Sequence, residues 1–222
     1  MKWAHPTTGL AIALLSGLIL STGSSSASVI LSNLDGNDGT GTLLGGSTRS
    51  KAMGFQIGSS AVTLDSVTLR LEIVDFTSVD IDVALFDDTG ATQPGSSLMT
   101  FSNPTISANG IANFTFDAPS NPTLDAGETY WIVVRDHSTA TTTRWMANSP
   151  SVTPTDPTPS TIDALHVGTK FSTLAYPPTG SSAILTSYAL TAIPEPAQLV
   201  AAGALVLGTF AAGRRLAGAR KS

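Results

Sequence analysis

Cysteine is absent from this 222-residue sequence. Without a thiol, the chain can form no disulfide, no thiolate zinc site, no cysteine nucleophile and no lipid-modified cysteine anchor. Charge is also sparse, because 11 Lys and Arg side chains stand against 16 Asp and Glu, and only 12% of the residues are charged. This composition argues against a disordered polyelectrolyte, and the net charge of -5 argues against a nucleic-acid binder, which needs a basic surface.

The N-terminal segment is typical of a secretory signal peptide. Lys2 precedes an uncharged apolar run, Leu10–Leu20, and the small residues Ser25 and Ala27 suit the pocket of signal peptidase. The run is shorter than the roughly 20 residues that a membrane span needs. The sequence therefore predicts a signal peptide over residues 1–27, which signal peptidase cleaves after Ala27. The alternative is an uncleaved N-terminal anchor.

The C-terminus carries three signals in succession: a Pro-Glu-Pro motif, an uncharged run over residues 197–213, and a basic tail over residues 214–222. The motif is Pro194, Glu195 and Pro196, and the basic residues are Arg214, Arg215, Arg220 and Lys221. As a helix, the run would be about 26 Å long, which makes a short transmembrane helix. The basic residues predict that the tail stays in the cytoplasm, so the middle of the chain is expected to be exported.

This order resembles the PEP-CTERM sorting domain of Gram-negative bacteria, over residues 194–222. The resemblance implies that Pro194, Glu195 and Pro196 are recognised by exosortase, a membrane-embedded transpeptidase. It also implies a protein that is anchored in the inner membrane before processing and that then resides at the cell surface or in the extracellular matrix. The alternative is a plain membrane anchor that follows a proline-rich stalk.

Between the two ends lie residues 28–193, with 6 basic and 15 acidic side chains. Thirteen of these acids are Asp, which favours turns over helices. Apolar and polar residues alternate at Val67–Ile73 and at Ile81–Leu85, as in strands with one face on a core. Further strand-like runs are Ser28–Leu34, Lys51–Ile57, Ser97–Phe101, Gly110–Phe116, Glu128–Asp136, Thr143–Ala147, Ile162–Val167 and Ala183–Ala192.

Roughly ten short strands without a helical repeat predict an all-β domain over residues 28–193. We expect a single antiparallel β-sandwich, jelly-roll-like in its connections, flanked by the signal peptide and the transmembrane helix. The proline-rich stretch Ser149–Ser160 is interpreted as a long surface loop rather than a domain linker, because only two strand-like runs follow it.

Several features of this domain resemble the choice-of-anchor R domain, which occurs in exported bacterial proteins with varying C-terminal anchors. They are Asn33-Leu34, Leu64–Ile73, Val83–Phe86 with the turn Asp87-Asp88-Thr89-Gly90, Pro94-Gly95, and the run Leu124–Trp131. The resemblance covers most of residues 33–145. It implies no catalytic residues that could be transferred to this chain.

Two groups of residues invite a chemical interpretation. Asp35, Asn37 and Asp38 offer oxygen ligands for calcium, although their spacing does not fit an EF-hand loop, and turn formation is the alternative. The sequence suggests no cofactor other than calcium. His137 and His166 are the histidines of the exported part, and Asp136 precedes His137. No Gly-x-Ser-x-Gly elbow accompanies them, so we do not expect an enzyme.

Four aromatic residues could form a sugar-stacking platform: Tyr130, Trp131, Trp145 and Tyr176. Tyr130 and Trp131 are adjacent on a predicted strand, so their side chains face opposite sides of a sheet. We expect core packing for this pair and an exposed Trp145 ring that could contact a glycan.

Together these features predict an exported surface or extracellular-matrix protein with a structural or adhesive role in the envelope or exopolysaccharide. The alternative is a carbohydrate-binding module, and a secreted hydrolase is less favoured. The expected partners are exosortase, signal peptidase, the membrane through the C-terminal helix, and exopolysaccharide. Nucleic acid is not expected.

Overall fold

The computed structural model describes residues 26–46, 49–140, 142–157 and 163–194. Within these ranges the chain forms strands and no helix. The described residues accordingly contain no helix of the length and apolarity that a membrane crossing requires. The predicted transmembrane helix and nearly all of the predicted signal peptide lie outside them. The strands are β1 (Ser28–Ser32), β2 (Asp38–Leu43), β3 (Ser50–Gln56), β4 (Val62–Ile73), β5 (Ile81–Asp88), β6 (Pro94–Thr100), β7 (Gly110–Asp117), β8 (Thr123–Leu124), β9 (Thr129–Asp136), β10 (Thr143–Asn148), β11 (Leu165–Ser172), β12 (Gly180–Ser181) and β13 (Tyr188–Pro194).

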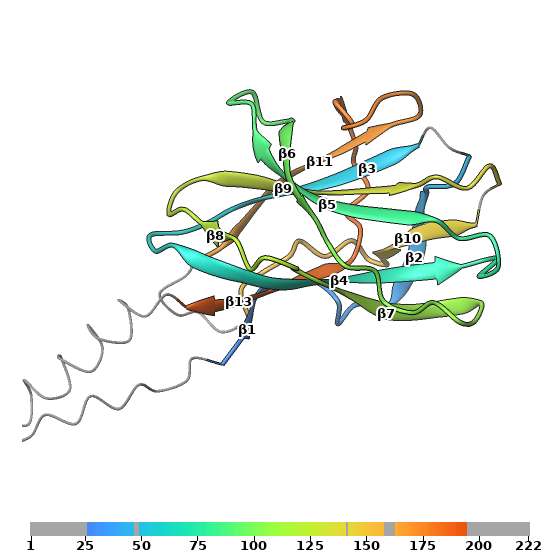
Figure 1. The fold of residues 1–222 in the computed structure, drawn as a ribbon, viewed down its shortest axis with the longest axis horizontal. Helices are drawn as coiled ribbons and strands as arrows, with labels where there is room; N and C mark the ends of the chain where they lie inside the picture. The colour runs from blue at the N-terminus through green and yellow to red at the C-terminus, as the bar shows by residue number, and fades with distance from the viewer. Residues whose placement is uncertain (1–25, 47–48, 141, 158–162, 195–222) are drawn as a thin grey trace, which may run out of the picture.

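The strands form two antiparallel sheets that lie one above the other (Figure 1). The six-stranded sheet has the order β12-β11-β3-β9-β5-β6. The seven-stranded sheet has the order β1-β13-β4-β10-β2, and β7 and β8 also pair with β4. The prediction of an all-β, antiparallel architecture is therefore confirmed, and the arrangement is consistent with a β-sandwich.

Strand β4 lies at the centre of the seven-stranded sheet. Buried side chains alternate with half-buried ones along most of its length, and Val67–Ile73 follows the predicted alternation. Residues 62–69 pair with β13 and residues 71–73 pair with β10. Because β7 pairs with residues 66–73, it must occupy the opposite edge, and β8 extends that edge. One strand therefore sets the positions of four others.

Apolar side chains from the inner faces of both sheets form the core. Leu64 and Leu69 project from the seven-stranded sheet, and Met53, Phe55 and Ile132 project from the six-stranded sheet into the same cluster. Each buried Å² of apolar surface contributes about 25 cal/mol. In a chain without disulfides, this burial and the strand hydrogen bonds hold the two sheets together.

Trp145 belongs to this core, so the prediction that its ring is exposed is wrong. Its exposed fraction is 0%, and its indole N–H donates to the carbonyl oxygen of Ser187 at 2.9 Å. The cause is its place in the sheet. Trp145 pairs with Thr42 on one side and with Leu71 on the other, and cross-strand neighbours share a face. Leu71 points into the core, and Trp145 follows it.

The first and last strands lie side by side (Figure 1). Ser28 of β1 pairs with Ala192 of β13, so both ends of the described domain leave from the same end of the sandwich. The last strand includes Pro194, which pairs with Val62. The sheet thus ends at the first residue of the Pro-Glu-Pro motif, one residue beyond the expected domain boundary.

Strands β2, β8 and β12 were not among the predicted runs. For β2 the reason is its two glycines. A Cβ on Gly41 would lie 2.2 Å from the carbonyl oxygen of Trp145, so the close approach of β10 excludes a side chain at a position that strand propensity would fill. The proline-rich stretch runs along the surface as expected as far as residue 157, the last residue described there. Within it, Thr155 exchanges two backbone hydrogen bonds with Ser32.

Lys51 is an unexpected member of the interior. Its exposed fraction is 0%, and its ammonium donates to the Ser182 hydroxyl at 2.7 Å and to the Ile184 carbonyl at 2.6 Å. Burial lowers the pKa of Lys51 to about 8. A charged lysine in this position opposes folding, because its loss of hydration is not offset by an ion pair among the described residues.

We predict that stability rises with pH between pH 8 and pH 9.5. In this window the folded state releases the Lys51 proton while the unfolded state, with a lysine pKa near 10.5, retains it. The free energy of unfolding should increase by about 1.5 kcal/mol relative to Lys51→Met, as measured by urea titration. Burial raises the pKa of Tyr188, and this reverses the slope above pH 10.

Lys170 on β11 is a matched control, because it is a half-buried lysine next to the same strand. Lys170→Met should keep the slope of the wild-type protein. A slope that survives Lys51→Met would contradict the assignment to Lys51.

Candidate functional site

A second apolar cluster covers the outer face of the six-stranded sheet. Ala84 and Phe86 of β5, Trp131 and Val133 of β9, and Ala52 of β3 form it. The Trp131 ring is fully buried, and its indole N–H donates to Oδ1 of Asp88 at 2.8 Å. Tyr130 faces the main core instead. The expectation that this pair packs in the interior is confirmed, with one ring on each side of the sheet.

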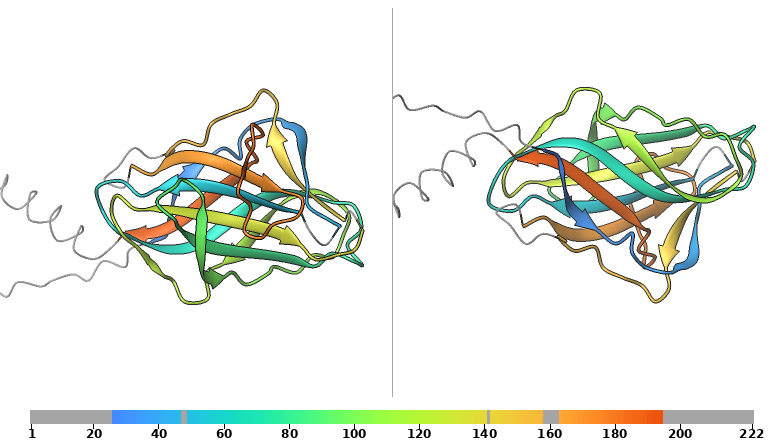
Figure 2. Two further views of the ribbon diagram at one scale, coloured as in Figure 1. Left: turned by 90° about the horizontal axis from the view of Figure 1, so that it is seen from above. Right: turned by 90° about the horizontal axis from the view of Figure 1, so that it is seen from below.

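The chain after β11 folds back over this cluster, as the left view of Figure 2 shows. Tyr176 lies edge-on to Phe86, with 5.7 Å between ring centroids, and the Arg135 guanidinium lies 5.3 Å from the Tyr176 centroid. The Ser50 hydroxyl donates to the Ala175 carbonyl at 2.7 Å and holds the segment in place. Tyr176 keeps 39% of its surface exposed. Of the four aromatic candidates, Tyr176 is therefore the ring that solvent reaches.

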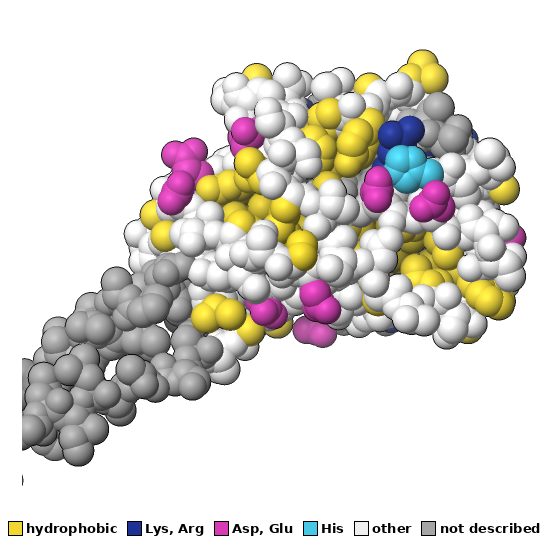
Figure 3. Space-filling model, viewed as in Figure 1, with side chains coloured by type: hydrophobic (Ala, Val, Ile, Leu, Met, Phe, Trp, Pro, Cys, Tyr) yellow, Lys and Arg dark blue, Asp and Glu magenta, His cyan; other side chains and the backbone are white. Residues whose placement is uncertain are grey.

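Charged groups surround this ring. Asp82 pairs across the strands with Arg135, and its carboxylate lies 2.6 Å from Nε2 of His137. The pKa of Tyr176 is raised chiefly by burial and further by Asp82, while Arg135 opposes the shift. We call Asp82, Arg135, His137 and Tyr176 the Tyr176 face. Figure 3 shows acidic, basic and histidine side chains gathered beside an apolar area.

The Tyr176 face combines groups that suit a polyhydroxylated ligand. A half-exposed aromatic ring offers a surface for the C–H face of a sugar, and the carboxylate, guanidinium and imidazole offer both acceptors and donors. Their elements hold them firmly, because Asp82 and Arg135 lie on paired central strands.

His137 contacts the Asp82 carboxylate at 2.6 Å, whereas Asp136, which precedes it in the sequence, has other partners. Asp136 is fully buried and accepts hydrogen bonds from the Ser138 backbone at 3.0 Å and from the Thr142 hydroxyl at 2.6 Å. The Ser138 hydroxyl bonds to Ala140 and Thr142. These contacts fix the turn after β9. His166 lies on a different strand, β11, where burial lowers its pKa.

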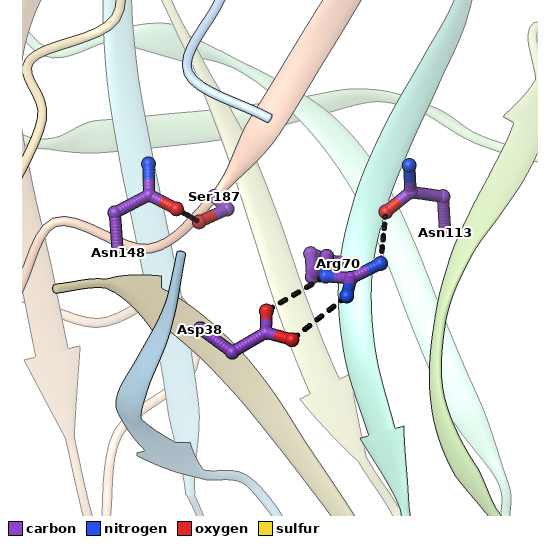
Figure 4. Close-up of polar contacts among 5 residues, drawn as sticks. All are labelled: Asp38, Arg70, Asn113, Asn148 and Ser187. Atoms are coloured by element: carbon purple, nitrogen blue, oxygen red, sulfur yellow. Dashed lines mark hydrogen bonds and ion pairs between the residues drawn. The ribbon is translucent and has the colours of Figure 1, made fainter. Parts of the chain in front are cut away.

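One calcium candidate, Asp38, has another side-chain partner in the described part of the chain. Both carboxylate oxygens of Asp38 accept hydrogen bonds from Arg70 at 2.7 Å, and Arg70 also donates to Asn113 at 3.2 Å (Figure 4). Asp35 is exposed, and the carbonyl of Asn37 accepts from the Ser149 backbone. Among the described residues no three His, Asp or Glu side chains gather as a metal site. Calcium binding stays a prediction.

Packing explains why this loop is rich in glycine. A Cβ on Gly36 would lie 2.3 Å from Cγ of Asn148, so any other residue at this position would displace the Asn148 side chain of β10. The Asn148 amide oxygen accepts from the Ser187 hydroxyl at 2.8 Å (Figure 4), and its nitrogen donates to the Asn33 carbonyl. The loop is thus attached to β10 and, through Ser187, to the segment before β13.

Most of the remaining predicted site residues lie outside the described part of the chain. Pro194 ends β13, whereas Glu195, Pro196 and the basic cluster Arg214, Arg215, Arg220 and Lys221 lie outside the described residues. The Tyr176 face was only partly predictable. Tyr176 was among the four aromatic candidates, but its neighbours Asp82 and Arg135 carry no signal beyond their places on predicted strands.

Comparisons with known proteins give no match to a family model, to a curated protein or to a solved structure. The PEP-CTERM and choice-of-anchor R resemblances therefore stay predictions.

We predict that Asp38→Asn lowers stability at pH 7 by up to about 1 kcal/mol, the usual limit for an exposed ion pair. The Arg70 guanidinium holds the pKa of Asp38 below its ordinary value. The carboxylate therefore contributes stability at pH values above the unfolded-state pKa near 3.8, and this contribution is lost as the pH falls through the folded-state pKa. Urea unfolding at pH 7 and pH 2.5 measures the difference.

Asp35→Asn provides the control, because Asp35 is an exposed acid in the same loop. It should leave stability unchanged at both pH values. Equal losses from both variants would show that the Arg70 pair contributes nothing. A separate thermal melt of chelated protein, with and without added calcium, tests the calcium prediction. An unchanged melting temperature would remove it.

Proposed function

We propose that this protein is an exported, exosortase-sorted surface or matrix protein whose sandwich serves a structural or adhesive role outside the cell. The observation that carries the proposal is the pairing of β1 with β13, which brings the two ends of the domain together at one end of the sandwich. A domain tethered through that end presents its opposite end to the surroundings.

The register of β4 supports this polarity. Val62 pairs with Pro194 at the tethered end, whereas Ile73 pairs with Thr143 at the other, about 36 Å away at 3.3 Å per residue. The two ends of the six-stranded sheet are assigned from β3. Its last residue, Gln56, precedes the short connection to Val62 at the tethered end, so its first residue, Ser50, lies at the far end. Ser50 pairs with Arg135, so the Tyr176 face lies towards the far end.

The absence of cysteine suits this role. An extracellular domain without disulfides depends on packing and hydrogen bonding, and two large sheets around one core supply both. A jelly-roll-like topology is part of the proposal. Its support is the repeated crossing of the chain between the sheets, from β2 to β3, back to β4 and again to β5.

We expect Glu195→Ala to abolish processing at the Pro-Glu-Pro motif, because exosortase would lose the charged centre of its recognition sequence. The full-size precursor should then accumulate in the inner membrane, as followed by fractionation and mass spectrometry of the mature C-terminus. Glu128→Ala, which removes an exposed glutamate of the domain, should be processed normally. Unchanged processing of Glu195→Ala would favour the plain anchor.

A carbohydrate-binding module is the second candidate, and the half-exposed Tyr176 ring beside Arg135 and Asp82 favours it. Tryptophan fluorescence is a poor probe of such binding, because Trp131 and Trp145 are both fully buried. Binding is better measured directly on immobilised exopolysaccharide.

We predict that Tyr176→Ala weakens exopolysaccharide binding at least fivefold, because one stacked ring contributes about 1 kcal/mol or more. Leu174→Ala is the matched control, since Leu174 is an apolar residue of the same segment with 87% of its surface exposed. It should bind like wild type. Equal binding by all three proteins would remove the Tyr176 face as a sugar site.

A further inference from the structure

A separate cavity of about 330 Å³ lies at the far end of the sandwich. Gly41, Thr42 and Leu43 of β2, Arg49 immediately before β3, Phe171 of β11, and the residues flanking β12 surround it. Leu43 pairs with Arg144, and Arg144 pairs with Glu72 near the end of β4, which places the cavity away from the chain ends. Its volume lies within the range of small-ligand sites.

Positive charge is concentrated at this cavity. Arg49 lines it, and the buried ammonium of Lys51 donates to Ser182 and Ile184, which also line it. Arg49 and Lys51 are two of the 6 basic residues in residues 28–193, a segment that also carries 15 acidic residues. None of the lining residues is acidic, and the ion pairs of the described chain include neither Arg49 nor Lys51. The domain is acidic, but this cavity is cationic.

The wall of the cavity also contains a buried hydroxyl and an aromatic ring. Thr42 lines the cavity with only 7% of its surface exposed, and its Oγ1 has no hydrogen-bond partner among the described residues. A buried polar atom without a partner costs about 1 to 3 kcal/mol. The half-buried Phe171 ring adds an apolar surface beside it.

We propose that this cavity binds a carboxylate-bearing sugar unit, a hexuronate. Arg49 and Lys51 supply the positive charge that a carboxylate requires, the Ser182 hydroxyl suits a ring hydroxyl, and Phe171 offers a surface for the apolar face of the ring. A cavity of about 330 Å³ accommodates one such ring. The inference deepens the proposed adhesive function by naming its ligand class.

The test is calorimetric titration of the full chain in a nonionic detergent at low salt, with glucuronate, glucose and acetate as probes. Glucuronate should bind at least tenfold more tightly than glucose, which lacks the carboxylate, and than acetate, which lacks the ring. Arg49→Gln should weaken glucuronate binding at least tenfold.

Arg144→Gln is the matched control, because Arg144 is a half-buried arginine that pairs with Glu72 outside the cavity lining. It should bind glucuronate like wild type. Arg49 is half-buried and outside the strands, so Arg49→Gln should fold, which its circular dichroism and melting temperature would verify.

Three results would overturn the inference: no glucuronate binding by wild type, undiminished binding by folded Arg49→Gln, or acetate binding as tight as glucuronate binding. The proposed function can fail separately. A protein that binds glucuronate but is never exported would contradict the sorting proposal alone, whereas a correctly processed protein that binds no glucuronate would contradict only this inference.

Discussion

Strand β4 is the element on which the rest of the sandwich depends. Its twelve residues carry β13 and β10 along one edge and β7 and β8 along the other. A shift of one residue in its register would turn Leu64, Leu69 and Leu71 from the core to the solvent. The alternation of its side chains therefore fixes both the inner face of the sheet and the strands beside it.

The position of β13 on β4 also determines the polarity of the molecule. Because β13 pairs with the first two thirds of β4 and β1 pairs with β13, the chain ends are held at one end. The remaining part of that edge is left to β10, which brings in β2 and with it the cavity. The proposed tethering and display would both follow from this one pattern of pairing.

Alternation made the strong strands predictable. Val67–Ile73 and Ile81–Leu85 were identified because apolar residues recur at every second position, and both lie within observed strands. The alternation of apolar and polar residues was less informative for the six-stranded sheet, because the segment around Tyr176 covers its outer face. There β9 is buried on both faces, and its sequence could not show which apolar residues belong to which layer.

Long-range contacts account for the errors. Nothing local distinguishes Gly41 in a strand from a glycine in a turn, because the reason for it is the backbone of Trp145, about a hundred residues away in sequence. Few apolar residues precede Trp145 in the sequence, and its ring was expected at the surface. Its two partner strands nevertheless place it in the core. Calcium binding by the Asp35–Asp38 loop stays a prediction, but the contact of Asp38 with the distant Arg70 was not expected from the sequence.

Lys51 has the least local explanation. It begins a strand-like run, where a lysine normally lies at a solvated edge, and yet it is fully buried. Replacing a lysine in such a place with an apolar residue would remove the desolvation that opposes folding, so packing alone gives no reason for it. Its two hydrogen bonds to the cavity wall hold the ammonium where a bound carboxylate would offset its charge. The proposed ligand would give this residue the physical reason that the fold does not.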